Sequence, residues 1–311
     1  MNNGTSQPRW NTELKQGLGS QVKPDANKIL FAAWQLTKEK RTGIGFGTLW
    51  SFFVLVAAIM LVSVLVAALN IDADGPAGEI LLGAIASIMW APLLAGLLLM
   101  ALRNATGEKT RGTDAFALLN EPWAFIGISA FIFVVTQLPY LIPGTNEFTA
   151  MLLSLPISFI FSFAMMVAVG TKCSVGNALY ASVIIIKNRI ASFFVFYIAI
   201  TVLSLVIALP TVLLASAFAA FEGVGTFVAI MLAVGAAYAL LFWVTPLFCH
   251  GVALYYAEIF GVAEKSVDSY AEGINEQETE HSRADMVNDE VDYQDSDSDP
   301  ERKNDRDNFQ A

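Results

Sequence analysis

Residues 44–69, IGFGTLWSFFVLVAAIMLVSVLVAAL, form one unbroken stretch without Asp, Glu, Lys or Arg. A helix needs about 20 consecutive apolar residues to cross the hydrocarbon core of a bilayer. Each backbone N–H and C=O must be satisfied within the segment because no water is available there, which favours a helix. The stretch therefore predicts a transmembrane helix. Six stretches meet these criteria: residues 44–69, 80–102, 123–141, 148–169, 191–219 and 224–255.

The composition of the 311 residues agrees with this interpretation. The hydrophobic share is 55%, the charged share is 15% and the mean hydropathy is +0.56, whereas charged residues make up about a quarter of soluble domains. We predict an all-α, polytopic membrane protein with six transmembrane helices and short cytoplasmic interfacial helices. No cleavable signal precedes the first span, which is therefore expected to act as an uncleaved anchor.

The charges beside the spans predict the orientation of the chain. The segments before the first span, after the second and after the fourth are basic, whereas the other three connections contain no Lys or Arg. Lys and Arg accumulate on the cytoplasmic side of membrane proteins, so both termini are predicted to be cytoplasmic. The basic residues include Lys38, Lys40, Arg41, Arg103, Lys109, Arg111, Lys172, Lys187 and Arg189, and the acidic ones on the other side are Asp72, Asp74, Glu79, Glu147 and Glu222.

The net charge of −10 arises at the end of the chain, because residues 262–311 contain 16 Asp or Glu against 5 Lys or Arg. A segment this charged, with few apolar residues, cannot bury enough surface to fold. We therefore expect a disordered N-terminal segment (1–25), a six-helix membrane domain (26–261) and an acidic disordered cytoplasmic tail (262–311). The tail either solubilises the protein or docks a basic protein partner, and no nucleic-acid partner is expected.

Each basic segment contains an amphipathic stretch before the next span. The stretches are ANKILFAAWQLTKEKR from residue 26, GTDAFALLNEPW from residue 112 and VGNALYASVIIIKNR from residue 175. Their apolar residues recur at spacings of three and four, which is typical of helices that lie in the membrane interface. One interpretation is an interfacial helix followed by a transmembrane hairpin, used three times. The other is that basic loops commonly carry such helices, and the sequence leaves both open.

Small residues in the last span predict a helix-packing seam. Gly225, Ala229, Ala233 and Ala237 recur every four residues. Lipid tails are as apolar as leucine, so helices in a bilayer associate through close packing of small residues. We expect this face to contact another helix.

Polar residues of the third and fourth spans have two interpretations. Their hydroxyls and amide either form interhelical hydrogen bonds, the usual role of such groups in membranes, or line a small polar cavity. The residues concerned are Thr136, Gln137, Ser154, Ser158 and Ser162.

Cys249 and His250 are adjacent in the last span of a chain with two cysteines and two histidines. Neighbouring residues of a helix point about 100° apart, so these two side chains do not face each other. A metal would need further ligands, and a catalytic cysteine would need a positioned base in a polar setting. We therefore expect no catalytic residue, metal site or cofactor here.

The last span ends in YYAEIFG, residues 255–261. Tyr256 to Phe260 resemble the Tyr-x-Asp/Glu-Ile-Phe ending of a family of uncharacterised bacterial six-helix inner-membrane proteins. That family is similar to the membrane domain found beside some glycerophosphodiesterases. Residues 32–50, 92–119 and 178–194 resemble other parts of it, so the resemblance covers residues 26–261. It implies an inner-membrane location and a six-helix fold, and it implies no reaction or catalytic residue.

Apart from His250, the spans contain no acidic or basic side chain, whereas proton-coupled transporters and pumps rely on such groups within the membrane. They also lack a metal-ligand set and a nucleophile paired with a base. We expect a non-enzymatic integral protein with a structural or regulatory role in a bacterial inner membrane. The alternative is a transporter or permease for a small neutral or lipidic solute, with the polar groups of the third and fourth spans along its path.

Reporter fusions test the predicted orientation. A reporter that is active only outside the cytoplasm is expected to be active when fused after Ala73 and inactive when fused after Arg111, because the basic segments stay inside. The reverse pattern of activity would contradict the orientation.

Overall fold

The computed structural model describes residues 9–68, 75–219, 221 and 223–262, and within these ranges the chain forms helices and no strand. This confirms the predicted all-α class. The chain separates into two compact units, Met1–Val267 and Asp268–Ala311, and the description below concerns the first. Residues 263–311 of the predicted tail, with Asp72, Asp74 and Glu222, lie outside the described residues.

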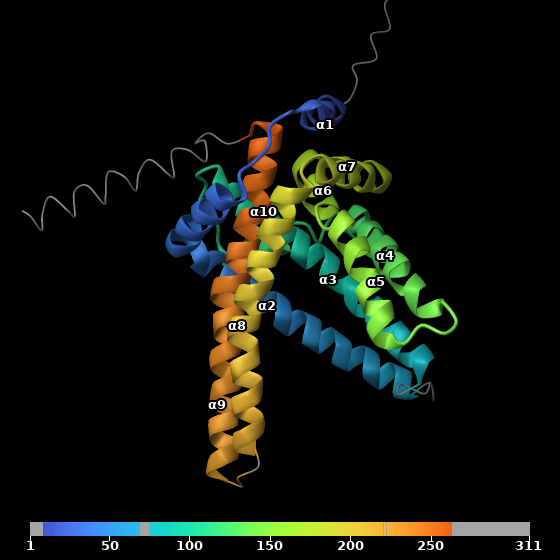
Figure 1. Ribbon diagram of the computed structural model, residues 1–311, viewed down its shortest axis with the longest axis vertical. Coiled ribbons are helices and arrows are strands. Elements are labelled where there is room, and N and C mark those ends of the chain that lie inside the picture. Colours follow the sequence, from blue (N-terminus) through green and yellow to red (C-terminus); the bar gives the residue numbers. More distant parts are fainter. Residues whose placement is uncertain (1–8, 69–74, 220, 222, 263–311) are drawn as a thin grey trace, which may run out of the picture. The chain divides into compact units, whose positions relative to one another are not determined.

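Within the described ranges, six helical stretches are long and apolar enough to cross a membrane, as predicted (Figure 1). The fourth is divided between two helices, and the sixth contains a π-helical turn. In chain order the elements are α1 (Arg9–Gly19), α2 (Ala26–Ala68), α3 (Pro76–Ala105), η1 (Gly112–Phe116), α4 (Trp123–Gln137), η2 (Leu138–Leu141), α5 (Glu147–Phe161), α6 (Ala164–Thr171), α7 (Val175–Asn188), α8 (Ile190–Ala219), α9 (Val224–Ala239), the π-helical η3 (Leu240–Val244) and α10 (Thr245–Phe260).

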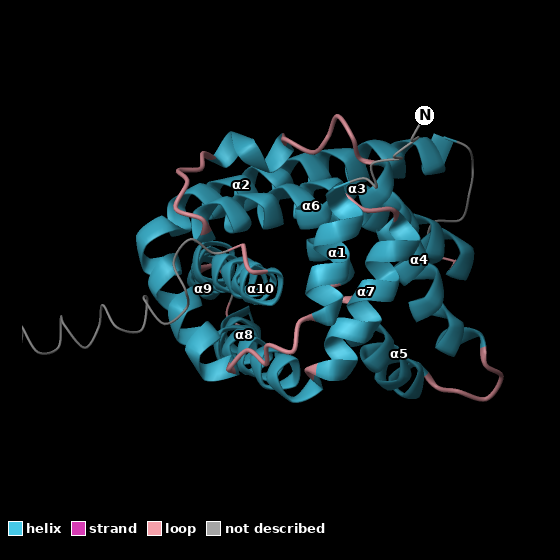
Figure 2. Cartoon of the chain, turned by 90° about the horizontal axis from the view of Figure 1, so that it is seen from above, coloured by secondary structure: helices cyan, strands magenta, loops and turns pink. Residues whose placement is uncertain are grey.

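The core is built around α10, most of whose residues are buried. Small residues let the neighbours approach closely: the ring of Phe196 lies against Gly251, where a Cβ atom would meet it at 2.3 Å. α2 and α3 pack along α10, while α8 reaches it through large rings, with Phe193 stacked on Tyr255 at a centroid distance of 4.4 Å. In the view of Figure 2, α2 and α8 lie on different sides of α10.

Burial is concentrated where the helices adjoin the three basic segments, residues 26–43, 103–122 and 170–190; we call this the basic end. The buried residues lie mainly in the first half of α2, the second half of α3, α6, α7, the start of α8 and α10. Towards the other end, apolar side chains are exposed, as expected where helices meet lipid. Examples are Phe52, Phe53, Met60, Leu61 and Val64 on α2, Leu205, Val206 and Leu209 on α8, and Phe227, Ile230 and Val234 on α9.

The three amphipathic stretches do not adopt one repeated structure. The first is continuous with the first span, since α2 runs without a break from Ala26 to Ala68. The second forms only the short 3₁₀-helix η1, Gly112–Phe116, and Pro122 precedes the start of α4. The third forms a separate helix, α7. The threefold unit suggested by the sequence is therefore not preserved in secondary structure.

The N-terminal segment requires a correction. Residues 1–25 were expected to be disordered, yet Arg9–Gly19 forms helix α1. Leu14 is buried, and Gly17 lies so close to the ring of Phe260 that a Cβ atom would meet it at 2.3 Å. α1 is only about three turns long, and a helix this short needs a packing partner to be stable. Its partner is the end of α10, which is far away in the sequence, so the sequence alone does not predict α1.

The predicted seam of α9 turns away from its neighbour. α9 packs against α8, with Gly225 buried and Ala229 half-buried, but Ala233 and Ala237 are exposed. A row of residues spaced by four rotates about 40° per step around a straight helix, so its later members leave the contact. Close packing along the whole row is therefore not observed within this chain.

Gly96 offers a test of packing at the basic end. A Cβ atom there would lie 1.8 Å from the carbonyl oxygen of Ala115, so Gly96→Ala must displace η1 from α3. We expect Gly96→Ala to lower the free energy of unfolding by about 2 kcal/mol, measured by denaturation in detergent. Gly235→Ala is the matched control, because no atom lies within 4 Å of its Cβ position. Equal stability of the two variants would contradict the packing.

Candidate functional site

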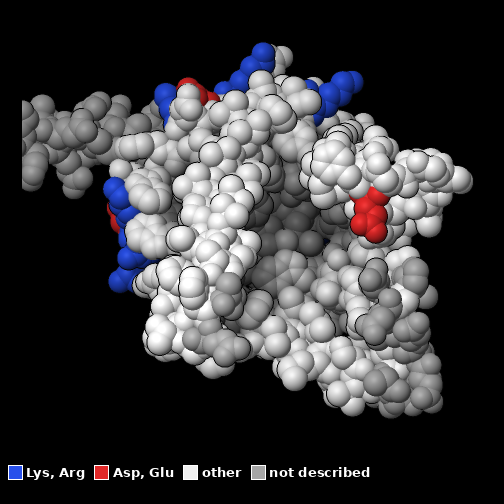
Figure 3. All heavy atoms as spheres, turned by 60° about the horizontal axis from the view of Figure 1, so that its bottom comes forward, with Lys and Arg blue, Asp and Glu red and all other residues white. Residues whose placement is uncertain are grey.

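A cavity of about 330 Å³ lies between α3, α4, α5, α6, α8 and α10. Rings and aliphatic side chains form most of its wall, hydroxyl groups interrupt them, and no charged residue lines it. Figure 3 shows a hollow near the centre of the face that it draws, with Lys and Arg side chains at the edges of that face. The lining residues are Ser87, Leu94, Ser129, Ile132, Phe133, Thr136, Ser158, Phe161, Ser162, Met165, Tyr197 and Phe248.

The structure places the five predicted polar residues differently. Thr136, Ser158 and Ser162 line the cavity, whereas Gln137 and Ser154 are not part of its lining. The first three come from different elements, and α4 faces the junction of α5 and α6 across the cavity. Spacings of four put Ser154, Ser158 and Ser162 on one side of the α5 backbone, but only the last two reach the space between the helices.

The hydroxyls of the lining donate to backbone carbonyls. Ser158 donates to Ser154 at 3.0 Å, and Ser162 donates to Phe159 at 2.7 Å. Thr136 donates to Ile132 and Phe133, both at 2.9 Å. These bonds lie within single helices, so the interhelical alternative is not observed at these three positions.

The interhelical bond at the cavity was not foreseen. Ser129 of α4 donates to the carbonyl of Ser87 of α3 at 2.9 Å. Each of these hydroxyl oxygens keeps lone pairs and can accept a hydrogen bond from a ligand. The wall is therefore richer in free acceptors than in free donors.

Tyr197 also lines the cavity. Its buried hydroxyl oxygen makes no hydrogen bond of regular geometry among the described residues, and the hydroxyl of Ser162 is the polar group that lies beside it. A buried hydroxyl without a partner costs free energy, about 1–3 kcal/mol by mutational estimates. Because Tyr197 lines the cavity, a bound molecule can supply the missing partner.

Local sequence explains why the fourth span opens beside the cavity. α5 contains Pro156, which lacks the N–H that would bond to the preceding turn. Serine hydroxyls that bond back to their own helix also bend it. α5 ends at Phe161 and α6 begins at Ala164, so the break lies at Ser162, within the cavity wall.

A second polar feature lies in the core of the basic end. The side chain of His250 on α10 is fully buried between Thr37 of α2 and Asn104 of α3. Its Nδ1 lies 3.0 Å from the hydroxyl oxygen of Thr37, and its Nε2 lies 3.1 Å from Nδ2 of Asn104. The amide of Asn104 donates to Nε2, so Nδ1 carries the proton and donates to Thr37. We call these three residues the His250 cluster.

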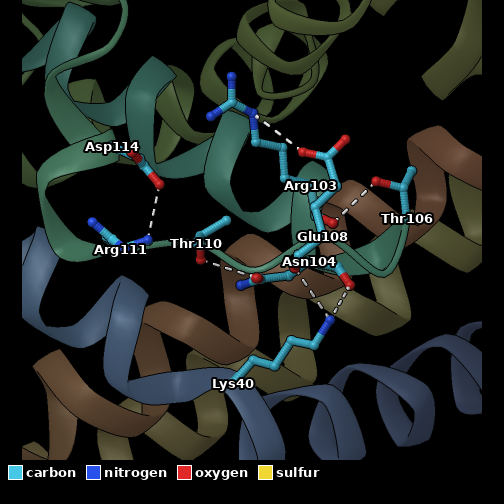
Figure 4. A network of polar contacts seen from close by, with 8 residues as sticks. All are labelled: Lys40, Arg103, Asn104, Thr106, Glu108, Thr110, Arg111 and Asp114. Carbon is cyan, nitrogen blue, oxygen red and sulfur yellow. Dashed lines mark hydrogen bonds and ion pairs between the residues drawn. The ribbon is translucent and has the colours of Figure 1, made fainter.

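The amide orientation in the cluster is fixed by a further contact. The Thr110 hydroxyl donates to Oδ1 of Asn104 at 3.0 Å, and the Lys40 ammonium donates to the backbone carbonyl of Asn104 at 2.9 Å. Lys40 also reaches the carbonyl of Glu108 at 3.4 Å. A cation at these carbonyls complements the negative end of the α3 dipole. Figure 4 shows this network joining α2 to the end of α3 and the connection after it.

The side chains of Phe242 and Trp243, in the π-helical turn Leu240–Val244, pack against aromatic rings of α2. Pro246 lacks an N–H for the regular helical ladder, and the Thr245 hydroxyl instead donates to the Leu240 carbonyl at 3.1 Å. Trp243 stacks on Trp34 with ring centroids 5.3 Å apart, and the guanidinium carbon of Arg41 lies 3.7 Å from the Trp243 ring centroid. Trp and Arg in such contacts are typical of the membrane interface.

Comparisons of the chain with protein-family models, with curated proteins and with solved structures find no match. Within the described residues, no group of three or more His, Cys, Asp or Glu side chains is placed to hold a metal ion. Cys249 is a buried free thiol, and its neighbour His250 is already bonded through both ring nitrogens.

Sequence reasoning considered His250 beside Cys249 and missed its partners. Thr37 and Asn104 are 213 and 146 residues away from it in the chain. The sequence does show that Thr37 and Asn104 are uncharged polar residues, each near the basic end of a different span. Because all three are buried, the cluster stabilises the convergence of α2, α3 and α10.

We expect Asn104→Ala to lower the free energy of unfolding by about 2–3 kcal/mol, because it leaves the buried Nε2 of His250 without a donor. The exposed Asn120, in the connection after α3, provides the control, and Asn120→Ala should change stability by less than about 0.5 kcal/mol. Combining Asn104→Ala with His250→Ala should cost less than the sum of the single changes. Strict additivity in denaturation experiments would show that the two side chains do not interact.

Proposed function

We propose that this chain is a non-enzymatic membrane protein that holds a neutral lipidic molecule in the 330 Å³ cavity, in a structural or regulatory role. The observation that carries the proposal is the buried hydroxyl of Tyr197, which makes no hydrogen bond of regular geometry among the described residues, in a wall of apolar and hydroxyl groups. Ligand cavities have volumes of about 300–1,000 Å³ and combine apolar walls with a few convergent polar groups. This cavity has that size and character.

The chemistry of the wall selects the class of ligand. No charged side chain lines the cavity, and an ion without a partner within the membrane would be costly, so the ligand is neutral. The hydroxyls of Ser129 and Ser158 already donate to backbone carbonyls and keep lone pairs that can accept a hydrogen bond. The ligand therefore carries O–H or N–H donors, together with an apolar chain that suits the rings around it.

A binding role agrees better with the packing than a permeation pathway does. Towards the basic end the helices close into the core around Phe163, Phe193 and Tyr255, all fully buried. A permease for the same solute is the second candidate. It is favoured by the break between α5 and α6 at the cavity wall, but it requires the core at the basic end to open.

The location of the protein is also part of the proposal. Six apolar helices support a multi-pass membrane protein. We propose that it resides in a bacterial inner membrane with both termini in the cytoplasm, on the basis of the charge pattern and the resemblance of residues 26–261 to the six-helix family. Docking of a basic protein partner by the acidic tail remains a prediction, and removal of residues 262–311 before affinity capture tests it.

A pair of lipids and a pair of variants test the ligand. The probe is a monoacylglycerol, compared with its O-acetylated form, which lacks donors; both are offered to the purified full chain. We expect tighter binding of the free alcohol, and about five- to tenfold weaker binding in Tyr197→Phe because one hydrogen bond is lost. Tyr238→Phe is the matched control, since Tyr238 is exposed on α9 and lies outside the cavity lining.

Two outcomes would change the proposal. Equal affinities for Tyr197→Phe and Tyr238→Phe would show that the cavity does not bind the lipid. Accelerated passage of the lipid across liposomes that contain the protein, compared with protein-free liposomes, would favour the permease over the binding role.

A further inference from the structure

Arg189, between α7 and α8, is a buried guanidinium that anchors the connection between α1 and α2. Its side chain is 5% exposed. Nε donates to the carbonyl of Val22 at 2.7 Å, and Nη2 donates to the carbonyl of Ser20. Nη1 is buried and has no hydrogen-bond partner among the described residues. The group therefore has unused donor capacity.

Among the side chains that the structure describes, no ion pair between Arg189 and a carboxylate is found; the side chain of Glu13 on α1 lies outside them. Asp25, in the same connection, instead accepts from the backbone N–H of Asn27 at 2.9 Å. Burial lowers the pKa of the Arg189 guanidinium, as expected when water is lost. An unpaired buried charge is strongly unfavourable, so an anion at this position would stabilise the fold.

The space beside Arg189 is a pocket of about 420 Å³, which we call the Arg189 pocket. Its described lining includes a second cation, Lys23, and three side chains that can donate hydrogen bonds, and none of these described residues is a carboxylate. α8 begins at Ile190, so the positive end of its dipole adjoins the pocket. The full lining is Leu18, Gly19, Ser20, Gln21, Val22, Lys23, Asn188 and Arg189.

We propose that the Arg189 pocket binds a phosphate-type oxyanion. Guanidinium and ammonium groups are the usual partners of phosphate oxygens, and the amides of Gln21 and Asn188 can bind the oxygens that remain. The exposed apolar residues Tyr180 and Val183 on α7, and Ile190 and Phe194 on α8, indicate that the pocket lies close to the membrane surface. The oxyanion is therefore supplied by a phospholipid headgroup or by a soluble phosphorylated molecule. This site is separate from the lipid cavity and does not depend on the proposed function.

Thermal unfolding of the full chain in detergent tests the site with inorganic phosphate as the probe and chloride at matched ionic strength as the reference. We expect phosphate to raise the midpoint of unfolding, and the apparent phosphate affinity of Lys23→Gln to fall by about tenfold or more, as for loss of a charged hydrogen bond. Lys187→Gln is the matched control: it removes the same charge at an exposed position two residues from Arg189 and outside the lining. It should keep the wild-type response.

Because Lys23 is exposed, Lys23→Gln is expected to fold, and it carries the test if Arg189→Gln does not. An equal response of Lys23→Gln and Lys187→Gln would overturn the proposal, since phosphate would then act through general screening. An absent phosphate response in the wild-type chain, both in detergent and in bilayers of a phosphate-free glycolipid, would overturn it as well.

Reconstitution separates the two sources of the oxyanion. Bilayers of a phosphate-free glycolipid alone are compared with bilayers of the same glycolipid that contain phosphatidic acid. If phosphatidic acid raises the midpoint of unfolding in the wild type and abolishes the response to added phosphate, the headgroup occupies the pocket. If the phosphate response persists unchanged, the ligand is soluble. Both results support the site, provided that Lys23→Gln loses the response and Lys187→Gln keeps it.

Discussion

The burial of α10 against α2 and α3 is the contact on which the remaining arrangement depends. Helices in a bilayer gain little by leaving lipid, so they need close packing and satisfied polar groups to associate. α10 provides both: Gly251 accepts the ring of Phe196, and His250 bonds to Thr37 and Asn104. Further along α10, the Tyr255 hydroxyl donates to the carbonyl of Ser192 at 3.0 Å. This bond joins α8 to the same core.

The cavity follows from this concentration of packing at the basic end. Where Ser129 bonds to Ser87, α4 stays close to α3, and α8 and α9 remain paired with each other. Between these groups of helices, the broken fourth span does not fill the space, and Tyr197 and Phe248 face it from the other side. A polar wall of hydroxyls is compatible with a membrane because Ser129, Thr136, Ser158 and Ser162 donate their protons to carbonyls within the protein.

The six spans could be predicted because a long uncharged stretch in a membrane protein almost always forms a transmembrane helix. The packing of these helices could not be predicted, because the sequence does not show which side chains meet. The row from Gly225 to Ala237 has the right residues, yet its drift around α9 carries Ala233 and Ala237 out of contact. Ser158 and Ser162 were correctly singled out as polar, but Tyr197, from a distant span, was not considered. His250 was recognised as unusual, and only the fold revealed which side chains satisfy it.

The continuity of α2 gives the molecule a mechanical property. At 1.5 Å per residue, its 43 residues extend about 65 Å, roughly twice the thickness of the hydrocarbon core. One part of this rod is surrounded by lipid and the other is fixed in protein beside the His250 cluster. Helices adjust to bilayer thickness by tilting, and an unbroken helix transmits that tilt along its length. Compression or thickening of the surrounding bilayer therefore acts as a torque on the core.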